Sequence, residues 1–238
     1  MVKEKTVGEL VAEDYRKAEV FKKFGIDFCC GGGKTVKDVC EKKGVDYAVL
    51  EKELLEVEKK SGSDTTNFNE WKLDALADYI VEKHHTYVKE NIPMLLEFSK
   101  KVARVHGNAN PEVVKIADLF QEAADELTHH MMKEEHMLFP YIKELANKQK
   151  NGSNGLHPPF GTVQNPIRMM EMEHEQVGDL LKQIAELSGN YTPPAHACNT
   201  YRVEYFKLKE FEDDLHRHIH LENNILFPKA IELEAVVA

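Results

Sequence analysis

Apolar residues recur at helical spacing along most of the chain, and the alternation that is typical of β-strands is nearly absent. The pattern predicts four long helices, over residues 69–105, 111–148, 163–187 and 198–234. Pro93 lies within the first and is expected to bend it. The breaks are rich in glycine and proline, as in "NGSNGLHPPFG" and "SGNYTPPA". Four amphipathic helices with one central break predict an all-α, up-and-down four-helix bundle.

The first 60 residues show shorter helical patterns. Gly25 is a natural end for one helix, and Thr35 can cap a helix that Gly44 ends. "SGSDTTN", residues 61–67, is small and polar and lies between two helical patterns. We therefore expect a small N-terminal helical domain in residues 1–60, a linker in 61–68, and the bundle in 69–238.

A repeated motif within the predicted bundle contains the candidate functional residues. "HMMKEEHMLFP" begins at His130 and "HIHLENNILFP" begins at His218, so each copy places a glutamate four residues after the histidine and a Phe-Pro pair after that. A further histidine lies at a similar distance before each copy: His85 precedes His130 by 45 residues, and His174 precedes His218 by 44. Residues four apart share one face of a helix. The two halves can therefore bring four imidazoles and two carboxylates into the bundle interior.

This donor set predicts a dinuclear metal site. A single His-x-x-x-Glu is usually a solvated surface pair, but two copies with the same tail and the same partner spacing are hard to obtain by chance. Imidazole and carboxylate suit iron, manganese or zinc, and inward Glu and His on four helices are typical of di-iron and di-manganese proteins. We assign Glu134 and Glu222 as bridging ligands. The terminal ligands are His85, His130, His174 and His218. Six side chains leave positions for an oxo or hydroxo bridge and for a small molecule.

Some assignments stay open at this point. On the first helix the repeat tolerates His84 as well as His85. Glu126 lies one turn before His130, where it can hydrogen-bond a ligand or line an access path, and Glu173 directly precedes His174. A solvated acidic side chain is an equally good interpretation of both glutamates.

The stretch "GIDFCCGGGKT" contains adjacent cysteines, Cys29 and Cys30. A phosphate-binding loop needs a glycine where this chain has Phe28, and the preceding segment is predicted to be a helix, so we reject that interpretation. Adjacent cysteines do not easily form a disulfide. The helix beginning near Thr35 is expected to lower a thiol pKa and favour a reactive thiolate. The competing interpretation is that the cysteines are small buried residues.

Composition narrows the function classes. Hydrophobic residues make up 42% of the chain, charged residues 30%, and the formal net charge is −10. No basic stripe is present, which argues against nucleic acid as a partner. No apolar run approaches the roughly 20 residues of a membrane span, and the charged N-terminus lacks a signal-peptide core. We therefore expect a cytoplasmic protein with no membrane partner, whose four cysteines stay reduced.

Together, "GIDFCCGGGKT" and the two histidine repeats resemble the repair-of-iron-centres family, whose members join an ScdA-type N-terminal domain to a hemerythrin-like domain. The resemblance covers nearly the whole chain. It implies two non-haem iron ions, repair of iron–sulfur clusters damaged by nitric oxide or peroxide, and iron–sulfur proteins as clients. It favours His85 by its spacing to Pro93, and it implies roles for Glu126, Glu173 and the cysteine pair. Gly33 departs from the more usual two-glycine run.

The resemblance implies a repair protein with a redox-active di-iron centre rather than a metabolic enzyme of the usual kind. Iron donation and nitric oxide handling both stay open as the act of repair, and a homodimer stays open as the assembly. Three other functions compete: a hemerythrin-like module that binds or senses oxygen or nitric oxide, a nitric oxide reductase or peroxidase-like enzyme, and a structural metal-bound bundle. The glutamates and the thiol pair argue against an oxygen carrier.

Overall fold

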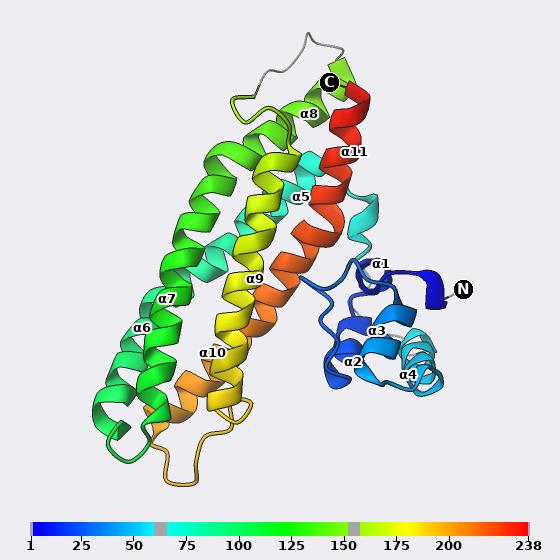
Figure 1. The fold of residues 1–238 in the computed structure, drawn as a ribbon. Helices are drawn as coiled ribbons and strands as arrows, with labels where there is room; N and C mark the ends of the chain where they lie inside the picture. The colour runs from blue at the N-terminus through cyan, green and yellow to red at the C-terminus, as the bar shows by residue number, and fades with distance from the viewer. Residues whose placement is uncertain (1, 60–65, 152–157, 238) are drawn as a thin grey trace. The chain divides into compact units, whose positions relative to one another are not determined.

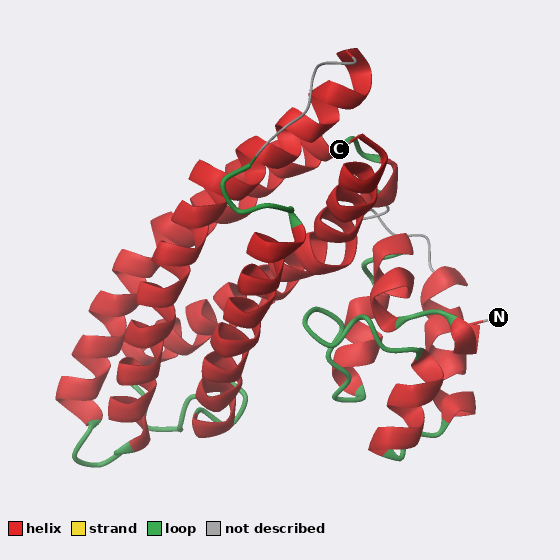
Figure 2. Ribbon diagram, turned by 45° about the horizontal axis from the view of Figure 1, so that its top comes forward, coloured by secondary structure: helices red, strands yellow, loops and turns green. Residues whose placement is uncertain are grey.

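The computed structural model describes residues 2–59, 66–151 and 158–237. All regular elements in this part of the chain are helices (Figure 2), apart from one isolated bridge between Thr6 and Thr35. The all-α prediction is therefore confirmed. Two compact units make up the chain: residues 1–77, 142–156 and 217–238 form the first, and residues 78–141 and 157–216 form the second.

The second unit is a four-helix bundle. Its main helices are α6 (Thr86–His106), α7 (Glu112–Lys133), α9 (Gln164–Leu187) and α10 (Asn199–Leu221) as far as residue 216. They run side by side in Figure 1, and α7 packs against both α6 and α9. Phe211 of α10 lies against Tyr87 of α6 and Phe120 of α7, with both Phe rings fully buried. The apolar face of each helix thus fills one common core, as the 3.6-residue pattern predicts.

The first unit contains the short N-terminal helices α1 (Val7–Glu13), α2 (Lys17–Lys23), α3 (Val36–Lys43) and α4 (Tyr47–Lys59). Thr6 and Glu9 form a capping box at α1. Thr35 caps α3 through the N–H of Asp38, and Gly44 ends α3 with a φ of 67°, as predicted. The unit also holds the C-terminal part of the chain, from Arg217 through α11 (Phe227–Val237).

Shorter elements complete the fold. They are η1 (Val2–Glu4), η2 (Phe68–Glu70), α5 (Leu73–Tyr79), η3 (Ile80–His85), η4 (Glu134–Leu138), α8 (Phe139–Asn151) and η5 (Glu222–Leu226). Three of them, η3, η4 and η5, are π-helical turns. They divide three of the four predicted long helices, and Pro93 lies inside α6 rather than at a division.

The predicted linker over 61–68 lies mostly outside the described residues, so the division into 1–60, 61–68 and 69–238 stays a prediction. None of the helices in the described residues combines the length and the apolar character that a membrane crossing needs.

Candidate metal centre

The three π-helical turns each carry a predicted metal ligand. His85 ends η3, Glu134 opens η4 and Glu222 opens η5. The N–H of Phe139 donates to the carbonyl of Glu134, and the N–H of Phe227 donates to that of Glu222, so both bonds span five residues instead of four. The next residue in each copy is a proline, which has no N–H to continue the α-helical ladder. The Phe-Pro tail of the repeat therefore coincides with a π-turn at the carboxylate, a feature common at functional sites.

Three histidines and one glutamate meet inside the bundle unit. Nε2 of His85 and Nε2 of His130 each lie 3.3 Å from Oε2 of Glu134. Nε2 of His174 lies 3.0 Å from Nε2 of His130. All four side chains are buried. Imidazole nitrogens that point at each other and at a shared carboxylate, away from water, form the arrangement of a ligand set.

The second copy of the repeat has the same local geometry. Nε2 of His218 lies 3.0 Å from Oε1 of Glu222, and both residues are buried. The predicted ligands fall into two groups of four, within each of which the ligand atoms all lie within 4.8 Å of one another. The groups are His85, Glu134, His218, Glu222 and His130, Glu134, His174, Glu222. Each group has its own pair of histidines, and both share the two glutamates.

Two of the imidazoles are oriented by carboxylates on another helix. Nδ1 of His85 donates to Glu135 at 2.7 Å, and Nδ1 of His130 donates to Glu173 at 2.9 Å. Because a carboxylate only accepts, each Nδ1 carries the proton, and each Nε2 keeps its lone pair for a cation. Lys89 and Lys133 pair with the same two carboxylates.

The charge state of these two carboxylates suits that role. Burial works against ionisation of Glu135, but the hydrogen bonds from Lys89 and His85 outweigh it and lower the pKa of Glu135. Burial likewise opposes ionisation of Glu173, and the hydrogen bonds from His130 and Lys133 outweigh it and lower its pKa. Both carboxylates are therefore anionic acceptors at neutral pH.

Of the remaining predicted residues, some contact the ligand groups and others do not. Glu173 orients His130. Glu126 is exposed on α7, so its role near the centre stays a prediction. His84 is buried and its Nδ1 bonds Asp214 at 3.0 Å, whereas His85 faces the glutamates.

Glu135 contacts a predicted ligand but was not among the predicted site residues. Two signals in the sequence point to it: it lies beside Glu134, and Lys89, which pairs with it, lies one turn after His85.

The cysteine pair sits on a turn built around one aspartate. Oδ1 of Asp27 accepts the N–H groups of Cys29 at 2.9 Å and Cys30 at 3.1 Å, and Oδ2 accepts that of Gly31 at 2.9 Å. Cys29 is buried and Cys30 is half-buried. The hydrogen bond with the Cys30 thiol, burial and the Asp27 charge raise the pKa of Cys29 well above its usual range. The expected lowering of the thiol pKa is therefore wrong for Cys29, because these local effects dominate the helix N-terminus.

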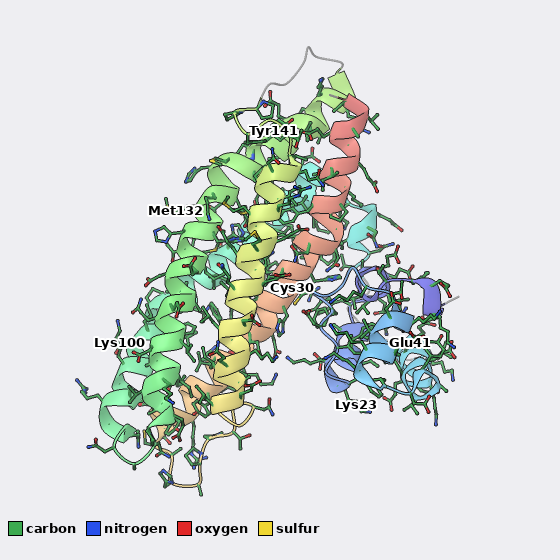
Figure 3. All side chains as sticks on the ribbon, viewed as in Figure 1. Lys23, Cys30, Glu41, Lys100, Met132 and Tyr141 are labelled. Atoms are coloured by element: carbon green, nitrogen blue, oxygen red, sulfur yellow. The ribbon has the colours of Figure 1, made fainter. Side chains whose placement is uncertain are left out.

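This turn packs onto the helix segment that bears Glu222, within the first unit. Nδ2 of Asn224 donates to the carbonyls of Phe28 at 3.2 Å and Cys29 at 3.1 Å. Figure 3 places Cys30 on the loop that makes this contact. The approach is close enough that a Cβ on Gly8 or Gly32 would meet Oδ1 of Asn224 at 2.2 and 2.4 Å. Only glycine fits at these two positions.

His220 packs against the same turn from the helix segment that bears Glu222. His220 is buried, and its ring lies against Phe28 and Tyr15 with centroids 6.0 and 5.9 Å away. Burial lowers the pKa of His220 to about 4, which keeps the ring neutral. Arg217 lies over the Tyr15 ring at 4.6 Å. His220 and Arg217 alternate with the predicted ligands His218 and Glu222 along one stretch of chain.

The donor set fits a metal. Four imidazoles and two carboxylates gather in two buried groups, and no thiol belongs to either group. Buried carboxylates and imidazoles in such number would be costly to hold without a cation. Imidazole with carboxylate suits first-row transition metals, and inward Glu and His on a helix bundle define a class: the metal-binding four-helix-bundle proteins.

Comparison with known proteins agrees with this class. The hemerythrin HHE cation binding domain family matches residues 76–230, and the ScdA N-terminal family, described as a domain of unknown function, matches residues 3–58. The iron–sulfur cluster repair protein YtfE of Musicola paradisiaca is 38% identical over 98% of this chain and 99% of its own. A probable iron–sulfur cluster repair protein of Haemophilus influenzae is 33% identical over 94% and 96%. The YtfE protein of Yersinia pseudotuberculosis is 36% identical over 96% and 97%. The chain belongs to the hemerythrin-domain family of iron–sulfur cluster repair proteins.

Proposed function

We propose that the two histidine–glutamate groups hold two non-haem iron ions. The observation that carries this proposal is that both groups contain Glu134 and Glu222 while dividing the four histidines equally. Carboxylates common to two ligand groups are suited to bridge two metals about 3.5–4 Å apart. The proposed cofactor is therefore a carboxylate-bridged iron pair, completed by an oxo or hydroxo bridge.

We infer that the protein repairs iron–sulfur clusters damaged by nitrosative or oxidative stress, through iron donation, nitric oxide handling or both. The names of its relatives support this function, and so does a ligand set of six side chains, which leaves room for a small ligand at each metal. Iron–sulfur proteins are the proposed clients. The proposed organisation is a cysteine-bearing domain in 1–60 and an iron-bearing bundle in 69–238.

The chain's own residues have definable tasks in this function. Glu135 and Glu173 hold the imidazoles of His85 and His130 with Nε2 free for iron. Apolar side chains beside the ligands, such as Phe139 stacked at 5.6 Å on His85, keep bulk water away. When bound, the iron pair supplies one-electron redox chemistry and affinity for nitric oxide.

A pair of adjacent histidines offers a matched test. His130→Ala removes a buried ligand, whereas His129→Ala removes an exposed neighbour on the same helix turn. We expect about two irons per anaerobically purified wild-type chain and His129→Ala chain, and clear loss of iron from His130→Ala. Equal iron content in all three would contradict the assignment.

The repair activity needs its own assay. A purified iron–sulfur dehydratase is inactivated with nitric oxide and then incubated with the wild-type protein or with the His130→Ala variant. We expect recovery of dehydratase activity only with the wild-type protein. If the wild-type protein has its full iron content but dehydratase activity does not recover, the repair function is contradicted and the metal site is not. Steady-state consumption of nitric oxide by the protein alone would instead favour a reductase.

A further inference from the structure

We propose that Asp27, Cys29 and Cys30 form a second cation site, which takes one soft or borderline divalent cation such as Fe²⁺ or Zn²⁺. The site lies outside the bundle's histidine–glutamate groups and is built from thiols and one carboxylate. As a transient stop for iron on its way to or from the bundle, it deepens the proposed repair function and rests on it.

The distances suit one ion. The two Sγ atoms lie 4.0 Å apart, and Sγ of Cys29 lies 3.3 Å from Oδ1 of Asp27. Two metal–sulfur bonds of about 2.3 Å span the sulfur–sulfur distance with an angle of about 120° at the metal. All three donors lie within 4.8 Å of one another. An ion can therefore contact both sulfurs and the carboxylate without movement of the backbone.

The turn is already fixed in the shape that binding needs. Asp27 accepts three backbone N–H groups, which hold Cys29, Cys30 and Gly31 in place. A carboxylate has about four lone-pair positions. The fourth accepts the thiol proton of Cys29, so the loss of that proton on binding frees this position for the cation. Asn224 holds the turn from the other side through the Phe28 and Cys29 carbonyls. Little conformational entropy is lost on binding, which favours affinity.

The site is shaped for exchange rather than for permanent storage. Cys29 is buried, but Cys30 is half-buried and Asp27 is exposed, so an ion can enter from solvent. Three protein donors leave the coordination open, unlike the four of a closed structural zinc site. Binding replaces the two thiol protons: the ion forms two metal–sulfur bonds, two S–H bonds break, and two protons pass to solvent, with no change of oxidation state.

The position of the site along the fold matches a role in transfer. Asn224, which holds the turn, lies two residues after the proposed metal ligand Glu222 in the same π-helical turn. The segment that carries one bridging carboxylate thus also carries the contact that positions the thiols.

Cadmium is the probe that separates this site from the bundle, because only thiolate ligands give its intense ultraviolet charge-transfer band. The full chain, with iron already bound and its thiols reduced, is titrated with Cd²⁺ alone. We expect one cadmium per chain with the thiolate band, loss of the band in Cys29→Ser and in Cys30→Ser, and about 10-fold weaker binding in Asn224→Ala. Cys40→Ser and Cys198→Ser, which change the two other cysteines, keep the band.

Absence of the band in the wild-type chain, or its loss with Cys198→Ser or Cys40→Ser, would overturn the site. Helical circular dichroism on each serine variant shows that the fold is kept. The His130→Ala variant separates the two proposals: a cadmium band in a chain without iron supports the thiol site independently of the bundle. Normal iron content with no cadmium band rejects the thiol site and leaves the bundle assignment standing.

Discussion

Two imidazoles of the candidate centre donate a hydrogen bond from Nδ1 to a carboxylate, and each of these carboxylates also pairs with a lysine. The chains of contact are His85–Glu135–Lys89 and His130–Glu173–Lys133. Each fixes which ring nitrogen carries the proton and in which direction the other nitrogen points. Such supporting residues tune affinity for a metal without touching it.

Glu135→Gln tests this arrangement. The amide can present its NH₂ to Nδ1 of His85 as easily as its oxygen, so the imidazole loses its fixed tautomer. We expect iron affinity to fall about 10- to 100-fold with little change in melting temperature, measured by competition with a chelator. Glu122→Gln, an exposed change on α7, is the control. A Glu135→Gln affinity equal to that of the wild-type chain would contradict the positioning role.

One of the buried carboxylates outside the two ligand groups is Glu204. Glu204 on α10 is fully buried, and burial raises its pKa to about 7, an effect that contact with Ser99 of α6 partly offsets. Because its pKa in the folded state is above the ordinary value near 4.5, its contribution to stability is fully present below about pH 4.5. That contribution is lost as the pH rises through about 7.

Glu204→Gln should therefore change the pH dependence of stability. The amide cannot ionise, so the variant does not lose this stability as the pH rises. We expect the unfolding free energy of the variant minus that of the wild-type chain to increase from pH 5 to pH 8, by an amount on the order of 2–3 kcal/mol. Chemical unfolding at the two pH values measures the gain, with Glu122→Gln as an exposed control. A constant difference between variant and wild type at both pH values would show that Glu204 does not titrate in this range.

At the scale of elements, the π-helical turns link the sequence repeat to the site. Each Phe-Pro pair follows a turn that begins at a glutamate of the candidate metal centre. The proline supplies no N–H for the carbonyl four residues before it, so one α-helical hydrogen bond of this segment is missing. A π-turn holds one residue more than an α-helical turn, so we expect it to set the direction of the glutamate side chain relative to the helix that follows.

Pro140→Ala restores the missing N–H and permits an ordinary α-helix through η4. We expect the melting temperature to rise, because proline is costly in a helix, while iron affinity falls about 10-fold as Glu134 turns away. Differential scanning calorimetry and chelator competition measure the two effects on the same samples. Unchanged iron affinity would mean that the proline does not set the geometry of the ligands.

The contact between the cysteine turn and η5 gives a second test at this scale. A Cβ on Gly8 would meet Oδ1 of Asn224 at 2.2 Å, whereas a Cβ on Gly33 would have nothing within 4 Å. We expect Gly8→Ala to lower the free energy of unfolding by about 1–3 kcal/mol and Gly33→Ala to leave it unchanged. In an Asn224→Ala background the cost of Gly8→Ala should largely disappear, because the clashing atom is gone. Additive effects in this double-mutant cycle would contradict the contact.

At the scale of the whole molecule, local signals and long-range contacts differ in how well sequence reveals them. The helices could be predicted because apolar spacing is a local pattern. The His-x-x-x-Glu repeat is also local, and it indicated six residues that the structure brings into two buried groups. The role of Glu135 could not be predicted, since it depends on which helix faces His85. The docking of the cysteine turn depends on Asn224, which is 195 residues from Cys29 in the chain. The Phe-Pro pairs mark the repeat in the sequence, but they do not by themselves predict the π-turns that precede them.

The central claim is that Glu134 and Glu222 are shared by two cations. Mössbauer spectroscopy of the full chain, reconstituted anaerobically with iron-57 and then exposed briefly to air, tests it most directly. Two ferric ions that share bridging ligands couple magnetically, so the account predicts two irons per chain with a diamagnetic ground state in an applied field. One iron per chain, or two irons that behave as isolated paramagnetic ions, would contradict it.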